Sequence, residues 1–115
     1  MTIRRIDPVA GNASRPTISV VVPTYEPGQH LIAALRSVLQ QDPGAGHMQI
    51  AVVDDDSRAV DVEALVAQAD PAGRIEILRL PANHGLAGNW NRCIDVARGQ
   101  IVHILHQDDW IADGF

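Results

Sequence analysis

Adjacent carboxylates near the end of the chain are the residues best suited to chemistry. His106-Gln107-Asp108-Asp109 follows directly on Ile101–Leu105, an apolar run with the composition of a buried strand. Neighbouring carboxylates where such a strand meets solvent repel each other, and a cation usually compensates the repulsion. Their oxygens suit Mg²⁺ or Mn²⁺, which bind through one or two carboxylates together with substrate phosphates. A solvated turn or a helix cap explains the pair equally well.

A second acidic cluster, Asp54-Asp55-Asp56-Ser57, follows the apolar run Ile50–Val53. Its carboxylates could bind metal, accept hydrogen bonds from a base or a ribose, or cap a following helix. Asp54 and Asp55 lie nearest the predicted strand and fit a functional role better. The last two residues of the cluster fit the helix cap.

The hydrophobic pattern predicts alternating strands and helices that would position these clusters. Strands are predicted over Ile18–Val22 (ended by Pro23), Ile50–Val53, Ile75–Leu80 and Ile101–Leu105. Helices are predicted between Pro27 and Pro43, from Asp61 as the cap to about Ala69, and after Gly88 to near Arg98, with Gly99 as the stop. This alternation predicts an α/β fold, a Rossmann-like parallel sheet of about four strands with flanking helices on both faces.

The unusual polar residues gather where the predicted strands end. They form four segments: Pro23–Glu26, Asp54–Ser57, Asn83–Gly85 and His106–Asp109. In parallel sheets the ligand lies beyond the carboxyl ends of the strands, so we expect these segments to meet in one site. Tyr25 is one of only four aromatic residues, and its ring could stack on a planar base or pack over the first helix.

Composition narrows the classes of function. The formal net charge of −5 argues against a nucleic-acid binder, and the absence of lysine excludes mechanisms that need one. A single cysteine, Cys93, rules out an internal disulfide and suits a reducing compartment. No apolar run approaches the ~20 residues of a membrane span. We therefore expect a cytoplasmic protein without a transmembrane segment, either free or peripheral to the inner face of the membrane.

Two other α/β classes are excluded. A phospho-receiver domain has its paired acids after the first strand and needs a late lysine, whereas here a complete strand–helix unit precedes Asp54. A dinucleotide oxidoreductase needs Gly-x-Gly-x-x-Gly after the first strand, and Pro23–Gly28 does not supply it.

Four motifs in order resemble family 2 glycosyltransferases, inverting enzymes of the GT-A fold that use nucleotide-activated sugars. The motifs are Ile18–Tyr25, Val52–Ser57, Asn83–Asn91 and Gly99–Asp109. The resemblance covers about Thr17–Phe115. It implies a nucleotide-sugar-binding domain over residues 17–115, which corresponds to the N-terminal half of a GT-A fold. Residues 1–16 contain Pro, Gly, Asn, Ser and Arg without a period, and this composition predicts a flexible tail.

The resemblance also implies roles for single residues. Thr24 and Tyr25 would hold the base, with Asp55 hydrogen-bonded to a uracil-like edge and Asp54 supporting it. The implied nucleotide-binding residues are Pro23, Thr24, Tyr25, Glu26, Asp54, Asp55, Gly85, Asn91 and Asp108, the last of which would contact the ribose or the water shell of a metal. Asp109 would ligate Mg²⁺ or Mn²⁺, which bridges the diphosphate and acts as a Lewis acid on the leaving group.

The implied donor is a UDP-, dTDP- or GDP-sugar, and the implied process is the synthesis of a cell-wall or surface polysaccharide. Three positions depart from the family pattern. His106 stands where many members have Asp, so the pattern does not fix the metal preference. Trp90 replaces a frequent Arg, which removes one polar contact to the nucleotide, and Glu26 replaces a frequent Asn, which alters the charge at the rim.

The family's acceptor site and general base lie in a second half that would follow Phe115. We therefore expect a domain truncated at its C-terminal end, and we assign it no catalytic base and no acceptor. The alternative is a non-catalytic nucleotide-binding remnant or fragment without transferase activity of its own. In both cases the fourth predicted strand leaves an apolar edge unpaired, and we expect self-association through that edge.

Overall fold

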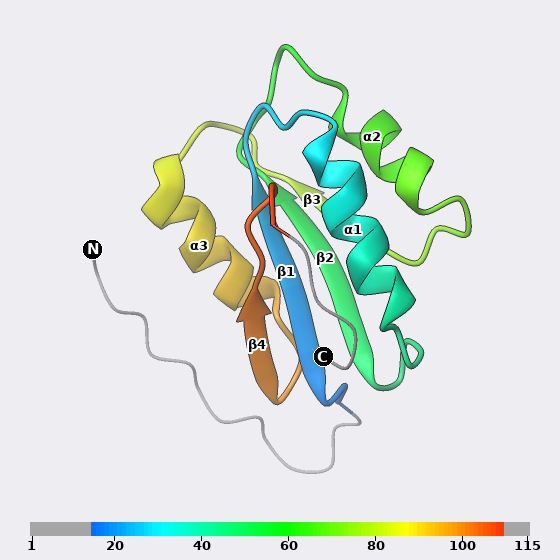
Figure 1. Ribbon diagram of the computed structural model, residues 1–115. Helices are drawn as coiled ribbons and strands as arrows, with labels where there is room; N and C mark the ends of the chain where they lie inside the picture. Colours follow the sequence, from blue (N-terminus) through cyan, green and yellow to red (C-terminus); the bar gives the residue numbers. More distant parts are fainter. Residues whose placement is uncertain (1–14, 110–115) are drawn as a thin grey trace.

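The computed structural model describes residues 15–109 of the chain. Within them lie, in order, β1 (Ile18–Thr24), α1 (His30–Gln40), β2 (Met48–Asp54), α2 (Val62–Ala69), β3 (Glu76–Arg79), α3 (Gly85–Val96) and β4 (Ile101–Ile104). The strands are parallel and form one sheet in the order β3-β2-β1-β4 (Figure 1). The predicted α/β class is confirmed. No helix in this part of the chain is long and apolar enough to span a membrane.

The sheet is covered on both faces, as predicted. Alternate residues of β1 and β2, such as Val20 and Ile50, pack with the buried residues of α1 and α2. The residues between them, such as Val21 and Val53, pack on the other face, where Cys93 of α3 joins them. Continuous apolar strands of this kind are typical of sheets buried on both faces.

The prediction that Ile101–Leu105 is a buried strand is wrong for Ile101–Ile104, whereas Leu105 is buried in the core. Ile101 is 60% exposed, and the other three residues of β4 are half-buried. The reason is its place in the sheet, because β4 is an edge strand that pairs with β1 on one side only. Apolar composition alone does not separate an edge strand from a central one.

β1 continues beyond its predicted end at Val22, through Pro23 to Thr24. Pro23 lies opposite Val53 in the register with β2, while the pairing with β4 ends at Val21. In a parallel strand alternate N–H groups point to opposite neighbours, and Val21 already faces β4. An N–H at position 23 would point toward β4, but the pairing of β1 with β4 has already ended at Val21. Pro23 therefore costs the sheet no hydrogen bond.

Gly99 is required for a reason other than the predicted helix stop. α3 ends earlier than expected, at Val96, and Ala97 is its C-cap. The Gln49 side chain takes the place of the backbone hydrogen bonds of a further helical turn. Its Nε2 donates to Val96 O (3.0 Å), and its Oε1 accepts from Arg98 N (2.7 Å). A Cβ on Gly99 would lie 2.4 Å from Ser19 N, so this position needs glycine because the backbone of β1 is so close.

Most of the predicted tail, residues 1–16, lies outside the described residues, as does the end of the chain from Trp110 to Phe115. The last two residues of the predicted tail form hydrogen bonds with the residues that directly precede β4. Arg15 donates to the carbonyls of Arg98 and Gly99 (both 3.0 Å), and Gln100 N donates to Pro16 O.

Burial of Cys93 predicts a dependence of stability on pH. Burial raises the pKa of this thiol from its ordinary 9.0 to about 12. The folded state keeps the thiol protonated, so this stabilisation is complete below pH 9.0 and is lost as the pH rises toward about 12. Between pH 9 and pH 11 the free energy of unfolding should fall by about 1 kcal/mol per pH unit relative to Cys93→Ala, as measured by urea denaturation. Identical pH profiles for the two proteins would contradict this.

Candidate nucleotide-binding site

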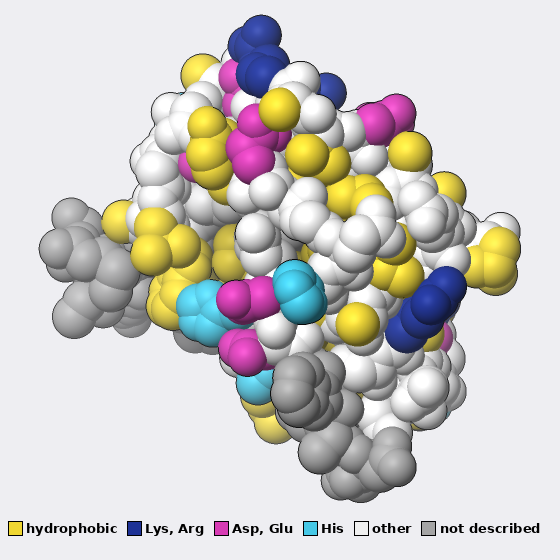
Figure 2. Space-filling model, turned by 45° about the horizontal axis from the view of Figure 1, so that its top comes forward, with side chains coloured by type: hydrophobic (Ala, Val, Ile, Leu, Met, Phe, Trp, Pro, Cys, Tyr) yellow, Lys and Arg dark blue, Asp and Glu magenta, His cyan; other side chains and the backbone are white. Residues whose placement is uncertain are grey.

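A pocket of about 510 Å³ lies at the carboxyl edge of the sheet. It is lined by Pro23, Thr24, Tyr25, Asp55, Asn83, Gly85, Leu86, Asn89, His106, Gln107 and Asp108. The strand order reverses between β1 and β4, so the pocket lies at the switch point where ligands bind in such sheets. Figure 2 shows acidic and histidine side chains gathered on this side of the molecule. The predicted convergence of four segments is therefore observed.

The structure brings together six of the residues predicted for the site: Pro23, Thr24, Tyr25, Asp55, Gly85 and Asp108. Four others, Glu26, Asp54, Asn91 and Asp109, are not part of the pocket lining. Three further lining residues, Asn83, His106 and Gln107, belong to the predicted segments but were given no individual role. Leu86 and Asn89 lie outside those segments.

Asp54 is buried behind the pocket lining and supports it through hydrogen bonds. Its side chain is buried and accepts hydrogen bonds from Thr24 Oγ1 (2.9 Å), Ser57 N (2.9 Å) and Ser57 Oγ (2.7 Å). These bonds hold the ends of β1 and β2 together. Ser57 is therefore not the helix cap that the sequence suggested; Asp61 is the N-cap of α2 and accepts from Ala64 N at 3.1 Å.

Asp55 places a carboxylate in the pocket wall. It is 3% exposed, and its Oδ1 accepts from His84 N at 2.7 Å. Its backbone is fixed on both sides, because Asp55 N donates to Thr24 O (2.9 Å) and Asn83 Nδ2 donates to Asp55 O (3.2 Å). A carboxylate held in this way can accept a hydrogen bond from a ligand N–H without rearrangement.

Asn89 connects α3 to the ends of β1 and β2 beside the pocket. It is 3% exposed, and its Nδ2 donates to Thr24 O (3.3 Å) and Val53 O (3.2 Å). Asn91, which the motif favoured, is half-buried instead. The helical period could have distinguished Asn89 from Asn91. Asn89 and Cys93 are four residues apart, so both lie on the face of α3 that packs against the sheet.

Gln107 connects the ends of β4 and β1. Its Oε1 accepts from Tyr25 N (2.9 Å), and its Nε2 donates to Tyr25 O (3.4 Å). These bonds leave the Tyr25 side chain 53% exposed beside the pocket. Gln107 belongs to the predicted segment His106–Asp109, but nothing in the sequence indicates that it contacts Tyr25.

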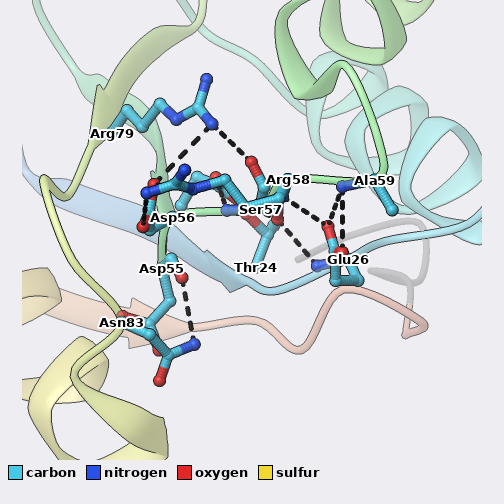
Figure 3. A network of polar contacts seen from close by, with 10 residues as sticks. Thr24, Glu26, Asp55, Asp56, Ser57, Arg58, Ala59, Arg79 and Asn83 are labelled. Carbon is cyan, nitrogen blue, oxygen red and sulfur yellow. Dashed lines mark hydrogen bonds and ion pairs between the residues drawn. The ribbon is translucent and has the colours of Figure 1, made fainter.

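Glu26 binds a neighbouring loop (Figure 3). Its carboxylate accepts from Arg58 N (3.0 Å) and Ala59 N (3.1 Å), and its own N donates to Ser57 Oγ (2.7 Å). Glu26 has φ +45°, a conformation that L residues rarely adopt. These three bonds stabilise that conformation, so Glu26 fixes the loop after β1 against the loop after β2.

Asp56 is held by two arginines (Figure 3). Arg58 Nη2 lies 2.9 Å from Asp56 Oδ2, and Arg79 Nη2 lies 3.8 Å from Asp56 Oδ1. The hydrogen bond from Arg58 lowers the pKa of the Asp56 carboxyl below its ordinary value. Asp56 also has a positive φ, +59°. Its carboxylate therefore stabilises the conformation of the loop that contains Asp55.

Asp108 and Asp109 form the candidate metal ligands. Both are exposed, and the turn that carries them is closed by a bond from Asp109 N to His106 O (3.1 Å). Within residues 15–109 no group of three or more His, Cys, Asp or Glu side chains could hold a metal. One or two carboxylates fit Mg²⁺ or Mn²⁺ when phosphates and water complete the shell. They do not fit a structural zinc site, which needs four protein ligands.

Known proteins share this fold and these motifs. The chain matches glycosyl transferase family 2 over residues 19–115. It is 38% identical over 92% of its length to an uncharacterised protein of Mycobacterium tuberculosis and 34% identical over 84% to the succinoglycan biosynthesis protein ExoO of Rhizobium meliloti. The crystal structure of Staphylococcus aureus TarS 1–349 in complex with UDP superimposes with a TM-score of 0.72, at 27% identity over 83% of this chain.

The chain covers only part of each of these proteins. It spans 32% of the M. tuberculosis protein, 26% of ExoO and 28% of the TarS chain. The family match, in contrast, begins at the second residue of β1 and includes every later strand and helix of the described structure. The chain belongs to glycosyl transferase family 2, of which it represents the N-terminal portion.

Proposed function

We propose that this chain binds a nucleoside diphosphate sugar as the donor-binding portion of a glycosyltransferase. The observation that carries the proposal is the pocket itself, which joins the ends of β1, β2 and β4 to the start of α3. It combines a buried carboxylate, Asp55, with an exposed aromatic ring, Tyr25, and a second carboxylate, Asp108. A base, a ribose and a diphosphate need these three kinds of contact.

In the proposed complex Tyr25 stacks on the base and Asp55 accepts the N–H of a uracil-type ring. Asp54 and Asn89 hold the strand ends that carry these two residues, and Glu26 holds the loop between them. UDP is the favoured nucleotide, because the structurally similar TarS was solved with UDP. A dTDP-sugar offers the same N–H and is the second choice, and a GDP-sugar is the third.

Asp109 and Asp108 would hold Mg²⁺ or Mn²⁺ against the diphosphate. When bound, the ion would neutralise the charge that develops on the leaving nucleoside diphosphate. We propose inverting transfer of the sugar in a longer protein that supplies the acceptor site and the general base. Similarity to ExoO supports a role in polysaccharide synthesis, and the reduced thiol of Cys93 suits a cytoplasmic location.

Calorimetric titration with UDP and dTDP, each with and without Mn²⁺, tests the proposal. We expect Mn²⁺ to raise the affinity for UDP, because the ion links the two carboxylates to the diphosphate. In Asp109→Ala this metal-dependent gain should be lost, with a fall of about tenfold in affinity at saturating Mn²⁺. Asp95→Ala, which removes an exposed carboxylate of α3 outside the pocket, is the matched control and should bind as the wild type does.

The opposite result would favour the second candidate. If the folded chain binds no nucleotide with or without Mn²⁺, the motifs remain only as scaffold, and the chain is a non-catalytic remnant.

We also propose that the chain self-associates through β4. Ile101 N donates to Thr17 O and Leu105 N donates to Val21 O, so Val102 and Ile104 direct their N–H and C=O groups away from β1. Together with the exposed Ile101 side chain, this edge can pair with a second copy.

Light scattering at increasing protein concentration should show a rise in mass. Ile101→Lys should reduce this rise, because a charge on an edge strand opposes pairing. Ile77→Lys, on the edge strand at the other side of the sheet, is the control and should leave the rise unchanged. A monomer at every concentration would contradict the proposal.

A further inference from the structure

Two of the residues that depart from the family pattern contact each other. Trp90 of α3 and His106 after β4 have ring centroids 5.5 Å apart and ring planes inclined at 45°. Tilted aromatic pairs at this distance are stabilising. The contact joins α3 to the segment after β4.

One member of the pair, His106, lies in the wall of the pocket. His106 is exposed and lines the pocket, together with Leu86 and Asn89 of α3 and with Asp55. Trp90 follows Asn89 directly but is half-buried and is not part of the lining. His106 is thus the member of the pair that a ligand can touch, and Trp90 supports it from the helix side.

Trp90 is held by packing on its ring. Its indole Nε1 is buried and has no hydrogen-bond partner in the structure from residue 15 to residue 109. Burying an unpaired N–H is costly, so the packing of the ring as a whole has to offset that cost. The contact with His106 is part of that packing.

We infer that His106 packs against the nucleotide base and that Trp90 is the positioning residue that fixes its imidazole. This inference rests on the proposed nucleotide binding. A wall of aromatic rings favours the face of a planar base over the charged diphosphate, because stacking needs a π surface. His106 shares the pocket with Asp55 and Tyr25, the residues proposed to read and stack on the base.

NMR titrations with uridine and with UDP test the inference, since uridine carries the base without phosphates. His106→Ala should weaken the binding of both ligands by the same factor, about tenfold. Trp90→Leu should weaken both about threefold, and Trp90→Phe, which keeps a ring, should restore most of the loss. His47→Ala removes an exposed histidine outside the pocket and should change neither affinity.

The chemical shifts of the His106 imidazole protons distinguish a contact with the ligand from a purely structural role. The ring current of Trp90 should shift the His106 ring protons, Trp90→Leu should remove that shift, and uridine should move them again in the wild type. Melting curves will verify that the variants are folded.

Each other outcome overturns the inference in a recognisable way. Unchanged affinity in His106→Ala would show that the imidazole does not contact the nucleotide. A loss for UDP but not for uridine would place His106 at the diphosphate instead. If the folded wild-type chain binds neither ligand, the proposed function itself fails, and the inference fails with it.

Discussion

Asp55→Asn is expected to lower the affinity for UDP about 100-fold and to shift the preference of the pocket toward CDP. The amide keeps the size of the carboxylate, and its oxygen can still accept from His84 N, which donates to Asp55 Oδ1 at 2.7 Å. The second oxygen becomes an NH₂ donor. Uracil presents N3–H to this position, so two donors would face each other, whereas cytosine presents an unprotonated N3 that accepts from the amide.

Calorimetry with UDP and CDP on the wild type and the variant measures this exchange. Asp61→Asn is the matched control, because Asp61 caps α2 outside the pocket and asparagine caps helices as well as aspartate does. Equal losses for UDP and CDP, together with a lower melting temperature, would mean that Asp55 only supports the fold. Unchanged UDP binding would remove Asp55 from the site.

Gly99→Ala should reduce the free energy of unfolding by about 3 kcal/mol, the upper part of the range for overpacking. The new Cβ would lie 2.4 Å from Ser19 N and 2.5 Å from Ile18 C, both of which are backbone atoms of β1. Neither can move without displacing the strand. The bond from Gly99 N to Ser19 Oγ (2.7 Å) would be strained by the same movement.

Urea denaturation followed by circular dichroism gives this difference, provided that the slope against urea is unchanged. Gly46→Ala is the control, since a Cβ there meets nothing within 4 Å and the residue has no positive φ. It should alter stability by less than about 0.5 kcal/mol. Equal stability of the two variants would contradict the close approach of β1 to Gly99.

The sequence predicts the order of the elements because apolar runs and helical periods are local signals. It predicts an unpaired edge at the fourth strand, and β4 does lie at the edge of the sheet, but it could not predict how far the Ile101 side chain is exposed there. The ends of α3 and β1 were also missed. The end of α3 depends on hydrogen bonds from Gln49 of β2, and the extension of β1 through Pro23 depends on where the pairing with β4 ends. Both are contacts between residues far apart in the sequence.

The candidate site follows the same division. The strand ends gave Thr24, Tyr25, Asp55 and Asp108, since parallel strands bring their carboxyl ends to one edge. Gln107 lies in a predicted segment, but its role was missed because that role is a contact with Tyr25, far away in the sequence. Asp54 and Glu26 have polar side chains, but those side chains hold loops and do not line the pocket.

The loops at this edge hold one another by bonds from a side chain of one to a backbone N–H of the next. Glu26 binds the N–H groups of Arg58 and Ala59, Asp55 binds that of His84, and Gln107 binds that of Tyr25. The conformational entropy of these loops is therefore lost when the chain folds and not when a ligand arrives. Binding should involve little induced fit, so that related nucleotides associate at similar rates and differ chiefly in how long they remain bound.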